Sequence, residues 1–292
     1  MRVGLQIWSF NWPGSPENIG AKLGELASAA DAAGFYSLWV MDHFFQMDRA
    51  ADAHEPMMEG YTTQAFMAAH TKTIKHGLMV TGGFYRYPGI LIKTVNTLDV
   101  LSGGRAYFGI GAGWYEREAL GLGVPFPPMK ERFARLEEIL QIANHMWKGD
   151  EAPYNGKYYQ LAEPISRPQV LSKPHPPILI GGSGEKKTLK LVAQYGDGCN
   201  LFASPDHLDV LAHKIDVLKE HCAEVGRNYD EIEKTTLGRG DMTTVTSGQE
   251  IVDYCGRLAA LGVNQAIFNL SNYDVAQIER YGKEVIPAVA KF

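Results

Sequence analysis

The chain has few cysteines and no long apolar run, and each absence excludes a class of protein. Its three cysteines, Cys199, Cys222 and Cys255, are far apart and form no CxxC pair. This argues against a disulfide framework and a structural zinc site, and it fits a reducing compartment. No stretch approaches the ~18 apolar residues that a membrane span needs. A strand-like run begins almost at the first residue, so we expect no signal segment and a cytoplasmic protein.

A strong excess of either charge is also missing. Lys and Arg number 28 against 33 Asp and Glu, which gives a net charge of −5 at pH 7. No basic stripe indicates nucleic acid or an anionic membrane as a partner, so we expect neither. We expect no metal site either, because Gly4–Trp8 contains no histidine and His54-Glu55 lies in a loop without a partner motif.

Apolar residues are abundant, at 45% of the 292 residues, and they recur in short runs separated by helical patterns. Apolar runs without polar alternation are typical of strands buried on both faces. We expect strands near Val3–Trp8, Ser37–Met41, Lys75–Thr81, Arg105–Ile110, Ile178–Ile180, Gly198–Phe202, Lys234–Gly238 and Asn264–Leu270. Helices are expected over Ile19–Ala33, Tyr61–Lys72, Ile90–Leu101, Met129–Trp147, Lys186–Tyr195, His207–Val225, Gln249–Leu261 and Asp274–Val289. About eight strand–helix units predict an α/β fold, a single (β/α)8 TIM barrel domain over residues 1–292; a doubly wound open sheet is the alternative.

Two segments interrupt this alternation. Phe44–Gly60 is a long loop after the second strand, and Gly149–Pro177 is proline-rich with a hairpin-like YNGKYY at its centre. We interpret them as insertions after strands 2 and 4. Both are expected on the side where a barrel carries its active site, as candidate lids.

Three of the predicted strands end in glycine or in an Asp-His pair. They lie in Ser37–His43, Arg105–Trp114 and Ile178–Gly184. Parallel α/β folds place their ligands at the carboxyl ends of the strands, so these ends are expected to form a cofactor cradle.

Asp42-His43 supplies the candidate acid–base group. The unperturbed histidine pKa of ~6.5 lies near working pH, which suits proton transfer, although a histidine satisfied within a loop is the alternative. The run Gly109–Trp114 is not a dinucleotide fingerprint, because Trp114 occupies the place of the third glycine. It indicates either a close approach of backbone to a ligand or tight strand packing.

Gly181-Gly182-Ser183-Gly184 precedes a predicted helix and is a candidate phosphate site. Free N–H groups at a helix amino terminus suit an anion, and glycines leave room for it. Ser183 could instead cap the helix, a role compatible with phosphate binding. A group of aromatic residues near the first two strand ends could stack on a ring system or serve as ordinary packing. The group comprises Trp8, Phe10, Trp12, Phe44 and Phe45.

The chain resembles the bacterial-luciferase-like superfamily of (β/α)8 oxidoreductases, and most closely the branch that uses the deazaflavin coenzyme F420. The resemblance is carried by Trp39–His43, Glu59–Thr63, the long run Arg86–Gly113 and Pro177–Asn200. Within the long run TLDVLSGGRAYFGIGAGW at Thr97–Trp114 is the characteristic part, and Glu118, Gly121 and Arg132-Phe133 continue it. It implies hydride transfer between F420 and a small organic substrate in a cytoplasmic homodimer. An FMN-dependent monooxygenase and a non-catalytic cofactor-binding barrel are the alternatives.

The resemblance also implies roles for individual residues. His43 is the catalytic residue, Asp42 a contact to the cofactor ring, and a cis peptide is expected at Met79–Val80 behind that ring. The full cofactor-binding set is Trp8, Asp42, Met79, Val80, Gly109, Gly111, Ala112, Gly181, Gly182, Ser183 and Gly184. Two positions depart from the family pattern. Trp114 replaces a glutamate of the sugar-phosphate dehydrogenases, which argues against glucose 6-phosphate, and Cys199 replaces a frequent tryptophan near the pocket.

Overall fold

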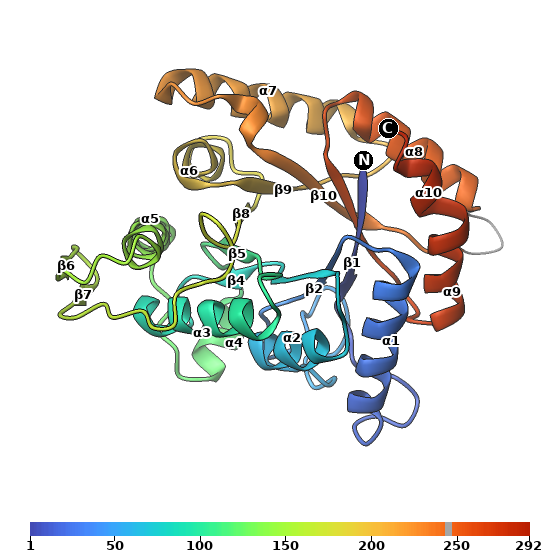
Figure 1. Cartoon of the computed structure of the whole chain (residues 1–292), viewed down its shortest axis with the longest axis horizontal. Coiled ribbons are helices and arrows are strands. Elements are labelled where there is room, and N and C mark those ends of the chain that lie inside the picture. The colour runs from blue at the N-terminus through green and yellow to red at the C-terminus, as the bar shows by residue number, and fades with distance from the viewer. Residues whose placement is uncertain (243–246) are drawn as a thin grey trace.

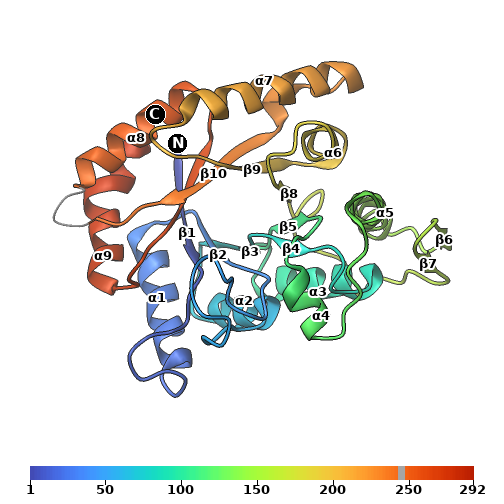
Figure 2. The same ribbon diagram turned by 180° about the vertical axis from the view of Figure 1, so that it is seen from behind.

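Parallel strands form a nearly closed barrel that helices surround on the outside (Figures 1 and 2). The computed structural model describes residues 1–242 and 247–292. Around the barrel the strands follow the order β3-β2-β1-β11-β10-β9-β8-β5-β4. Their bounds are β1 Arg2–Ile7, β2 Ser37–Val40, β3 Lys75–Leu78, β4 Thr81–Gly82, β5 Phe108–Gly111, β8 Ile178–Gly181, β9 Gly198–Phe202, β10 Glu233–Arg239 and β11 Gln265–Asn269.

The third predicted strand is present in two pieces, and together they close the barrel. β3 pairs with β2 and β4 pairs with β5, while a bridge between His76 and Ala106 joins the two edges. The peptide Met79–Val80 between the pieces is cis, as the resemblance implied. The predicted (β/α)8 barrel is therefore confirmed, and the open doubly wound sheet was the wrong alternative.

The outer helices match the predicted pattern closely. They are α1 Ile19–Ala33, α2 Gly60–Ala69, α3 Pro88–Leu101, α5 Met129–Trp147, α6 Thr188–Tyr195, α7 Leu208–Val225 and α8 Gly248–Ala260. The last predicted helix is present as α9 Val275–Arg280, the π-turn η2 Tyr281–Val285 and α10 Ile286–Val289. Two short elements were not predicted, α4 Glu116–Gly121 and the 3-10 turn η1 Tyr229–Glu231. None of the described helices is long and apolar enough to cross a membrane.

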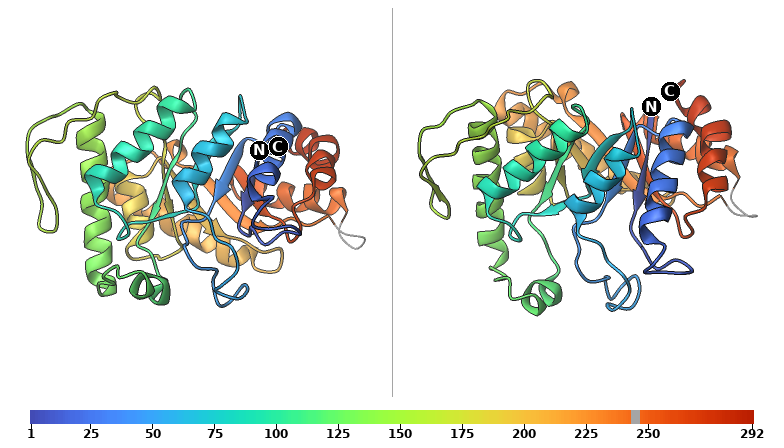
Figure 3. Two further views of the ribbon diagram at one scale, coloured as in Figure 1. Left: turned by 90° about the horizontal axis from the view of Figure 1, so that it is seen from below. Right: turned by 60° about the horizontal axis from the view of Figure 1, so that its bottom comes forward.

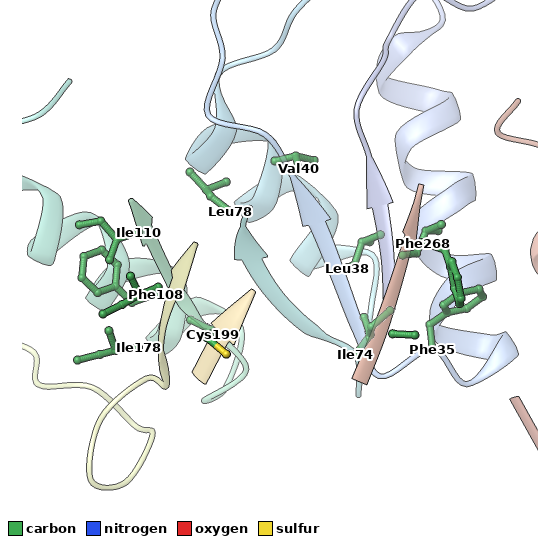
Figure 4. Close-up of a cluster of buried hydrophobic side chains, with 14 of the residues drawn as sticks. Phe35, Leu38, Val40, Ile74, Leu78, Phe108, Ile110, Ile178, Cys199 and Phe268 are labelled. Atoms are coloured by element: carbon green, nitrogen blue, oxygen red, sulfur yellow. The ribbon is translucent and has the colours of Figure 1, made fainter. Parts of the chain in front are cut away.

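Apolar side chains fill two layers, one between strands and helices and one inside the barrel. The outer layer includes Leu38, Phe108, Ile178 and Cys199 (Figure 4). The inner layer is a smaller cluster of Trp39, Met79, Tyr107, Leu179 and Ile267. Because successive side chains of a strand point to opposite faces, Cys199 faces the helices. The departure from the family pattern at Cys199 therefore lies outside the cavity, which its neighbour Asn200 lines instead.

The two irregular segments join the barrel at opposite ends of its strands (Figure 3). Residues 41–59 connect β2 to α2 at the carboxyl ends of the strands. Gly149–Pro177 instead follows α5 and leads into β8, and it contains the predicted hairpin as β6 Tyr154–Asn155 and β7 Gln160–Leu161.

The position of Gly149–Pro177 excludes a lid role. Its His175 stacks on Trp147 in the last turn of α5, with ring centroids 5.1 Å apart. The carbonyl of Pro177 accepts a 2.9 Å hydrogen bond from the N–H of Phe108, where β5 begins. Helices of a βα barrel run back toward the amino ends of the strands. The lid prediction for this segment is therefore wrong. Both of its ends join the barrel at the amino ends of the strands, and its hairpin packs on the outside of α5, where the N–H groups of Lys157 and Tyr159 donate to Glu138. None of its residues lines the cavity between the strand ends.

Candidate functional site

A cavity of about 490 Å³ lies where the carboxyl ends of β2, β4, β5, β8 and β9 meet. Most of the residues predicted to form the site line it, namely Asp42, His43, Met79, Val80, Gly111, Ala112, Gly181, Gly182, Ser183 and Gly184. The three strand ends singled out in the sequence thus converge on one space. Trp8 and Gly109 are not among the lining residues.

Trp8 and Gly109 have structural surroundings instead. The indole N–H of Trp8 donates a 3.0 Å hydrogen bond to the carbonyl of Leu270, which holds the ring against the end of β11. A Cβ at Gly109 would lie 1.9 Å from the carbonyl oxygen of Leu78. Glycine is required at this position because β5 passes very close to the end of β3. Of the two interpretations offered for the glycine run, tight strand packing therefore applies to Gly109.

His43 lies in the cavity wall with one ring nitrogen held by a buried glutamate. Its Nδ1 is 3.2 Å from Oε1 of Glu118, and the two side chains are 14% and 0% exposed. The ring edge packs against Trp114 and Tyr115 at centroid distances of 5.4 and 5.7 Å. Glu118 does not line the cavity whereas His43 does, so the second nitrogen, Nε2, is the one available to a ligand.

Glu118 is held in its ionised form by donors from three directions. Burial raises its pKa, but hydrogen bonds from His43, from the Phe45 backbone and from Tyr85 outweigh burial and lower the pKa. The N–H of Phe45 donates at 2.7 Å, the N–H of Phe44 donates to the same oxygen, and the hydroxyl of Tyr85 donates to the other. An ionised acceptor at Nδ1 favours the tautomer with its hydrogen on Nδ1, which leaves Nε2 free to accept a proton.

Asp42 is committed to an ion pair. Its two oxygens accept hydrogen bonds of 2.7 and 2.8 Å from the guanidinium of Arg86, and one also accepts from the N–H of Gly82 at 3.0 Å. Arg86 contacts Glu59 as well, at the start of α2. Burial lowers the pKa of Arg86, but the hydrogen bond and charge of Asp42 prevail and raise it. Asp42 therefore offers the cavity a carboxylate that is already neutralised.

Glycine backbone forms another part of the cavity wall. A Cβ at Gly181 would lie 2.8 Å from the methyl groups of Val80, and one at Gly111 would lie 3.0 Å from one of them. Gly182 adopts φ +117°, a conformation that favours glycine. These glycines let β5 and β8 close around Val80 and leave a surface without side chains, which fits the flat ring of a flavin-like cofactor.

Below this wall, the amino terminus of α6 points into the cavity region without a side-chain cap among the described residues. Lys187 occupies the N-cap position and makes no capping hydrogen bond, and Ser183 does not cap the helix. Thr188, the first residue of α6, lines the cavity together with Gly184. Uncapped N–H groups carry the partial positive charge of the helix dipole. The loop and helix end thus fit a phosphate group.

The outer mouth of the cavity is aromatic. Trp114 is 46% exposed and stacks on Tyr115 at 5.0 Å, while the guanidinium of Arg49 lies 4.6 Å from its ring centroid. Phe202 is 71% exposed and lines the same space. Arg132 is the only Lys or Arg among the described lining residues, and its guanidinium donates to the carbonyls of Pro127 and Gly113. The one cation of the cavity lining is thus held by backbone carbonyls, and Arg49 at the mouth is held over the face of Trp114.

Comparison with known proteins identifies the family of this barrel. The family model of luciferase-like monooxygenases matches residues 1–239. The chain belongs to the luciferase-like monooxygenase family. An F420-dependent glucose-6-phosphate dehydrogenase of Kineococcus radiotolerans is 31% identical to it over 220 residues, which are 73% of this chain and 62% of that protein. The protein of the same name from Mycobacterium avium is 32% identical over 217 residues, with the same coverage. The chain thus spans less than two thirds of these relatives' length.

Solved structures share the luciferase-like fold at low identity. The F420-dependent tetrahydromethanopterin reductase of Methanopyrus kandleri superposes with a TM-score of 0.78 at 19% identity and covers 98% of both chains. A monooxygenase of Streptomyces bottropensis superposes with a TM-score of 0.80 at 15% identity, over 98% of this chain and 99% of that one. Because one is a reductase and the other a monooxygenase, the fold alone does not choose the chemistry.

Three functional residues of this luciferase-like site were missed as such in the sequence. Glu118 and Arg86 were noted only as parts of the family pattern, and Tyr85 was not noted. Each acts on a partner far along the chain: Glu118 on His43, Tyr85 on Glu118 and Arg86 on Asp42. The one available signal was an acidic residue, Glu118, in a predicted loop at the same barrel end as His43.

Proposed function

We propose that this chain is an oxidoreductase that moves a hydride between coenzyme F420 and a small organic substrate, working as a single barrel domain. One observation carries the proposal: His43, oriented by the ionised Glu118, lines the same cavity as the glycine wall. When bound, coenzyme F420 supplies the deazaflavin carbon that gives or takes the hydride.

His43 is the proposed proton carrier, acting at Nε2. Glu118 holds Nδ1 and stabilises the imidazolium that forms when Nε2 takes a proton from a substrate hydroxyl, and the reverse transfer protonates a carbonyl oxygen. The aromatic edges of Trp114 and Tyr115 restrict the ring and limit access of water. A group oriented in this way, within hydrogen-bond reach of the substrate oxygen, meets the geometric requirement for acid–base catalysis.

The proposed cofactor site runs from Val80 to the amino end of α6. Val80, Gly111 and Ala112 form the wall for the ring, and Gly181–Gly184 hold the phosphate. Support comes from the missing side chains of the wall and from the uncapped helix. Asp42 and Met79 complete the lining, with Asp42 acting through its ion pair to Arg86.

The proposed substrate is uncharged and largely apolar. The relatives are named for glucose 6-phosphate, but this chain has Trp114 directly after its glycine run, and its cavity has an aromatic mouth. A phosphate dianion needs cations or free N–H donors, and those of α6 are assigned here to the cofactor. Turnover of simple secondary alcohols or their ketones, with none of glucose 6-phosphate, is the expected outcome.

Direct cofactor binding tests the core of the proposal. Titration of the protein with F420 and, separately, with FMN, followed by absorbance or fluorescence, ranks the two affinities. Tighter binding of F420 together with F420-dependent turnover is expected. Tighter binding of FMN with oxygen-dependent turnover would favour a flavin monooxygenase, and binding without any turnover would favour a non-catalytic barrel.

The proposed working form is a cytoplasmic homodimer. Apolar side chains exposed on and beside α3 support a self-association surface: Tyr87, Ile90, Leu101 and Leu171 are 77, 66, 71 and 53% exposed. Clustered exposed apolar residues commonly mark a protein interface. The three cysteines are free and buried, which supports a reducing compartment.

A further inference from the structure

A groove that carries four lysines lies between α5 and α6. Its volume is about 380 Å³, and Lys130, Lys186, Lys187 and Lys190 line it. All four side chains are exposed. The lysines gather at the end of the groove near the amino termini of the two helices, whereas Glu137 lines it two turns further along α5.

The groove continues from the proposed phosphate site. Phe133 on α5 lines both the groove and the cavity. On the other side, Lys187 in the groove immediately precedes Thr188 in the cavity wall, and the ammonium of Lys187 lies 5.3 Å from the ring centroid of Phe133. A ligand whose phosphate sits at Gly184 and Thr188 would therefore extend between Lys187 and Phe133 into the groove.

The four lysines have no ion-pair partner within 4.0 Å in the described part of the chain. Glu185, their neighbour in sequence, is held by Lys214 and by His213 at 3.3 Å. Glu137 accepts a hydrogen bond from the hydroxyl of Tyr195 instead. Four lysines against the single carboxylate of Glu137 leave a net positive charge in the groove, and such a charge creates a local potential that attracts a polyanion.

We propose that this groove binds the anionic tail of the cofactor, the chain of glutamates that coenzyme F420 carries beyond its phosphate. The inference rests on the proposed use of F420. Tail carboxylates, with pKa values near ~4, are fully ionised at neutral pH. Each carboxylate can pair with one or two of the lysines, and the number of pairs grows with the length of the tail. FMN has no such tail, so the groove also favours F420 over FMN.

The experiment compares two forms of the cofactor that share the ring and the phosphate. One form bears a glutamate tail and the other lacks all glutamates, and the binding of each is followed by fluorescence at low and at high salt. Exposed ion pairs contribute about 1.5- to 5-fold in affinity each. The tail-bearing form is therefore expected to bind several-fold more tightly at low salt. That advantage should shrink at high salt because exposed pairs are screened.

The variant Lys130→Gln/Lys190→Gln removes two groove lysines that lie outside the phosphate loop. The affinity of the tail-bearing form should fall about 2- to 25-fold from the loss of two exposed pairs, while that of the tail-free form stays within twofold. The matched control is Lys22→Gln/Lys283→Gln, which removes two ion-paired lysines on outer helices and should leave both affinities unchanged.

Two results would overturn the inference while the proposed function stands. One is equal binding of the two forms by the parent protein, and the other is an equal loss of both forms in the groove variant. If neither form binds the parent, the proposed use of F420 fails, and the tail site fails with it.

Discussion

His43 and Glu118 depend on each other for the chemistry proposed here. The histidine supplies a nitrogen that can carry a proton, and the glutamate fixes which nitrogen that is. Neither side chain would suffice alone, because a free histidine ring populates both tautomers and burial without donors would favour the protonated form of the glutamate. The hydrogen bond between them fixes the orientation of the histidine ring.

Replacement of His43 by alanine should separate binding from turnover. A positioned acid or base typically contributes ~10²–10⁴ in rate, so we expect His43→Ala to lose at least about 100-fold in kcat. Cofactor affinity should stay within a few-fold of the parent value, because the glycine wall and α6 do not involve His43. Near-normal kcat with a true substrate would remove the proposed proton carrier.

Glu118 should contribute to stability in a pH-dependent way. Its folded-state pKa lies below the ordinary value of 4.5, so its ionised form stabilises the fold above that value and the contribution is lost as pH falls below it. Glu118→Gln should lower the free energy of unfolding by about 1–3 kcal/mol at neutral pH, because buried donors lose a charged acceptor.

Urea unfolding at pH 7 and at about pH 4 measures this difference. The gap between the parent protein and Glu118→Gln should narrow at the lower pH, where the parent glutamate begins to protonate in the unfolded chain. The exposed neighbour Glu116, on the same short helix, supplies the control: Glu116→Gln should unfold like the parent at both values. A gap independent of pH would mean that Glu118 stabilises by shape alone.

Helix α6 and the loop before it are the elements on which cofactor affinity depends. Gly184 suits a test better than Gly182, because Gly182 has φ +117° and any side chain there would strain the backbone. A Cβ at Gly184 would meet the hydroxyl of Thr188 at 2.9 Å, beside the free N–H groups. A branched side chain at this position would cover the helix end without a forbidden φ.

We expect Gly184→Val to weaken binding of a phosphate-bearing deazaflavin by about 10-fold or more, the scale of one to two charge-assisted hydrogen bonds. A deazaflavin that lacks the phosphate should bind parent and variant alike, and the melting temperature should change little. Equal loss for both ligands would mean that the substitution disturbs the ring site rather than the phosphate site.

Strands and long helices were predictable because local signals specify them. Buried parallel strands form continuous apolar runs, and α1 and α5 were predicted to the residue from their apolar periodicity. α4 was missed because Glu116–Gly121 is short and charged, so its apolar face is too small to show periodicity. The direction of α5 already implied that Gly149–Pro177 begins at the amino ends of the barrel strands, and the lid interpretation overlooked this direction.

Pairings across the barrel were not predictable in the same way. His43 and Glu118 are 75 residues apart, and Asp42 and Arg86 are 44 residues apart. Spacing along the chain does not reveal which ends of different strands face each other, since that depends on barrel closure. The resemblance predicted which residues form the proposed cofactor wall. It also predicted that Asp42 contacts the cofactor ring, but it did not predict the ion pair between Asp42 and Arg86.

The assembled molecule offers a test of the proposed dimer. Ile90→Asp/Leu101→Asp places two charges on the exposed apolar face of α3, and charges at the core of an interface are strongly unfavourable. Light scattering should give the mass of a dimer for the parent and of a monomer for the variant. A parent that is monomeric at high protein concentration would contradict the proposal.

Hydrogen bonds and an ion pair join the loop after β2 to the segment after β5 that contains α4. Glu118 binds the N–H groups of Phe44 and Phe45, and the hydroxyl of Tyr115 donates to Asp48 at 2.9 Å, beside the ion pair of Arg117 with Asp48. Barrel enzymes usually diversify by changing one loop at a time on an unchanged frame. Here a change of length in either segment would displace the histidine held between them. In this protein the two loops therefore act as one structural unit, and a change of specificity would require matched changes in both loops or changes at the cavity mouth around Phe202.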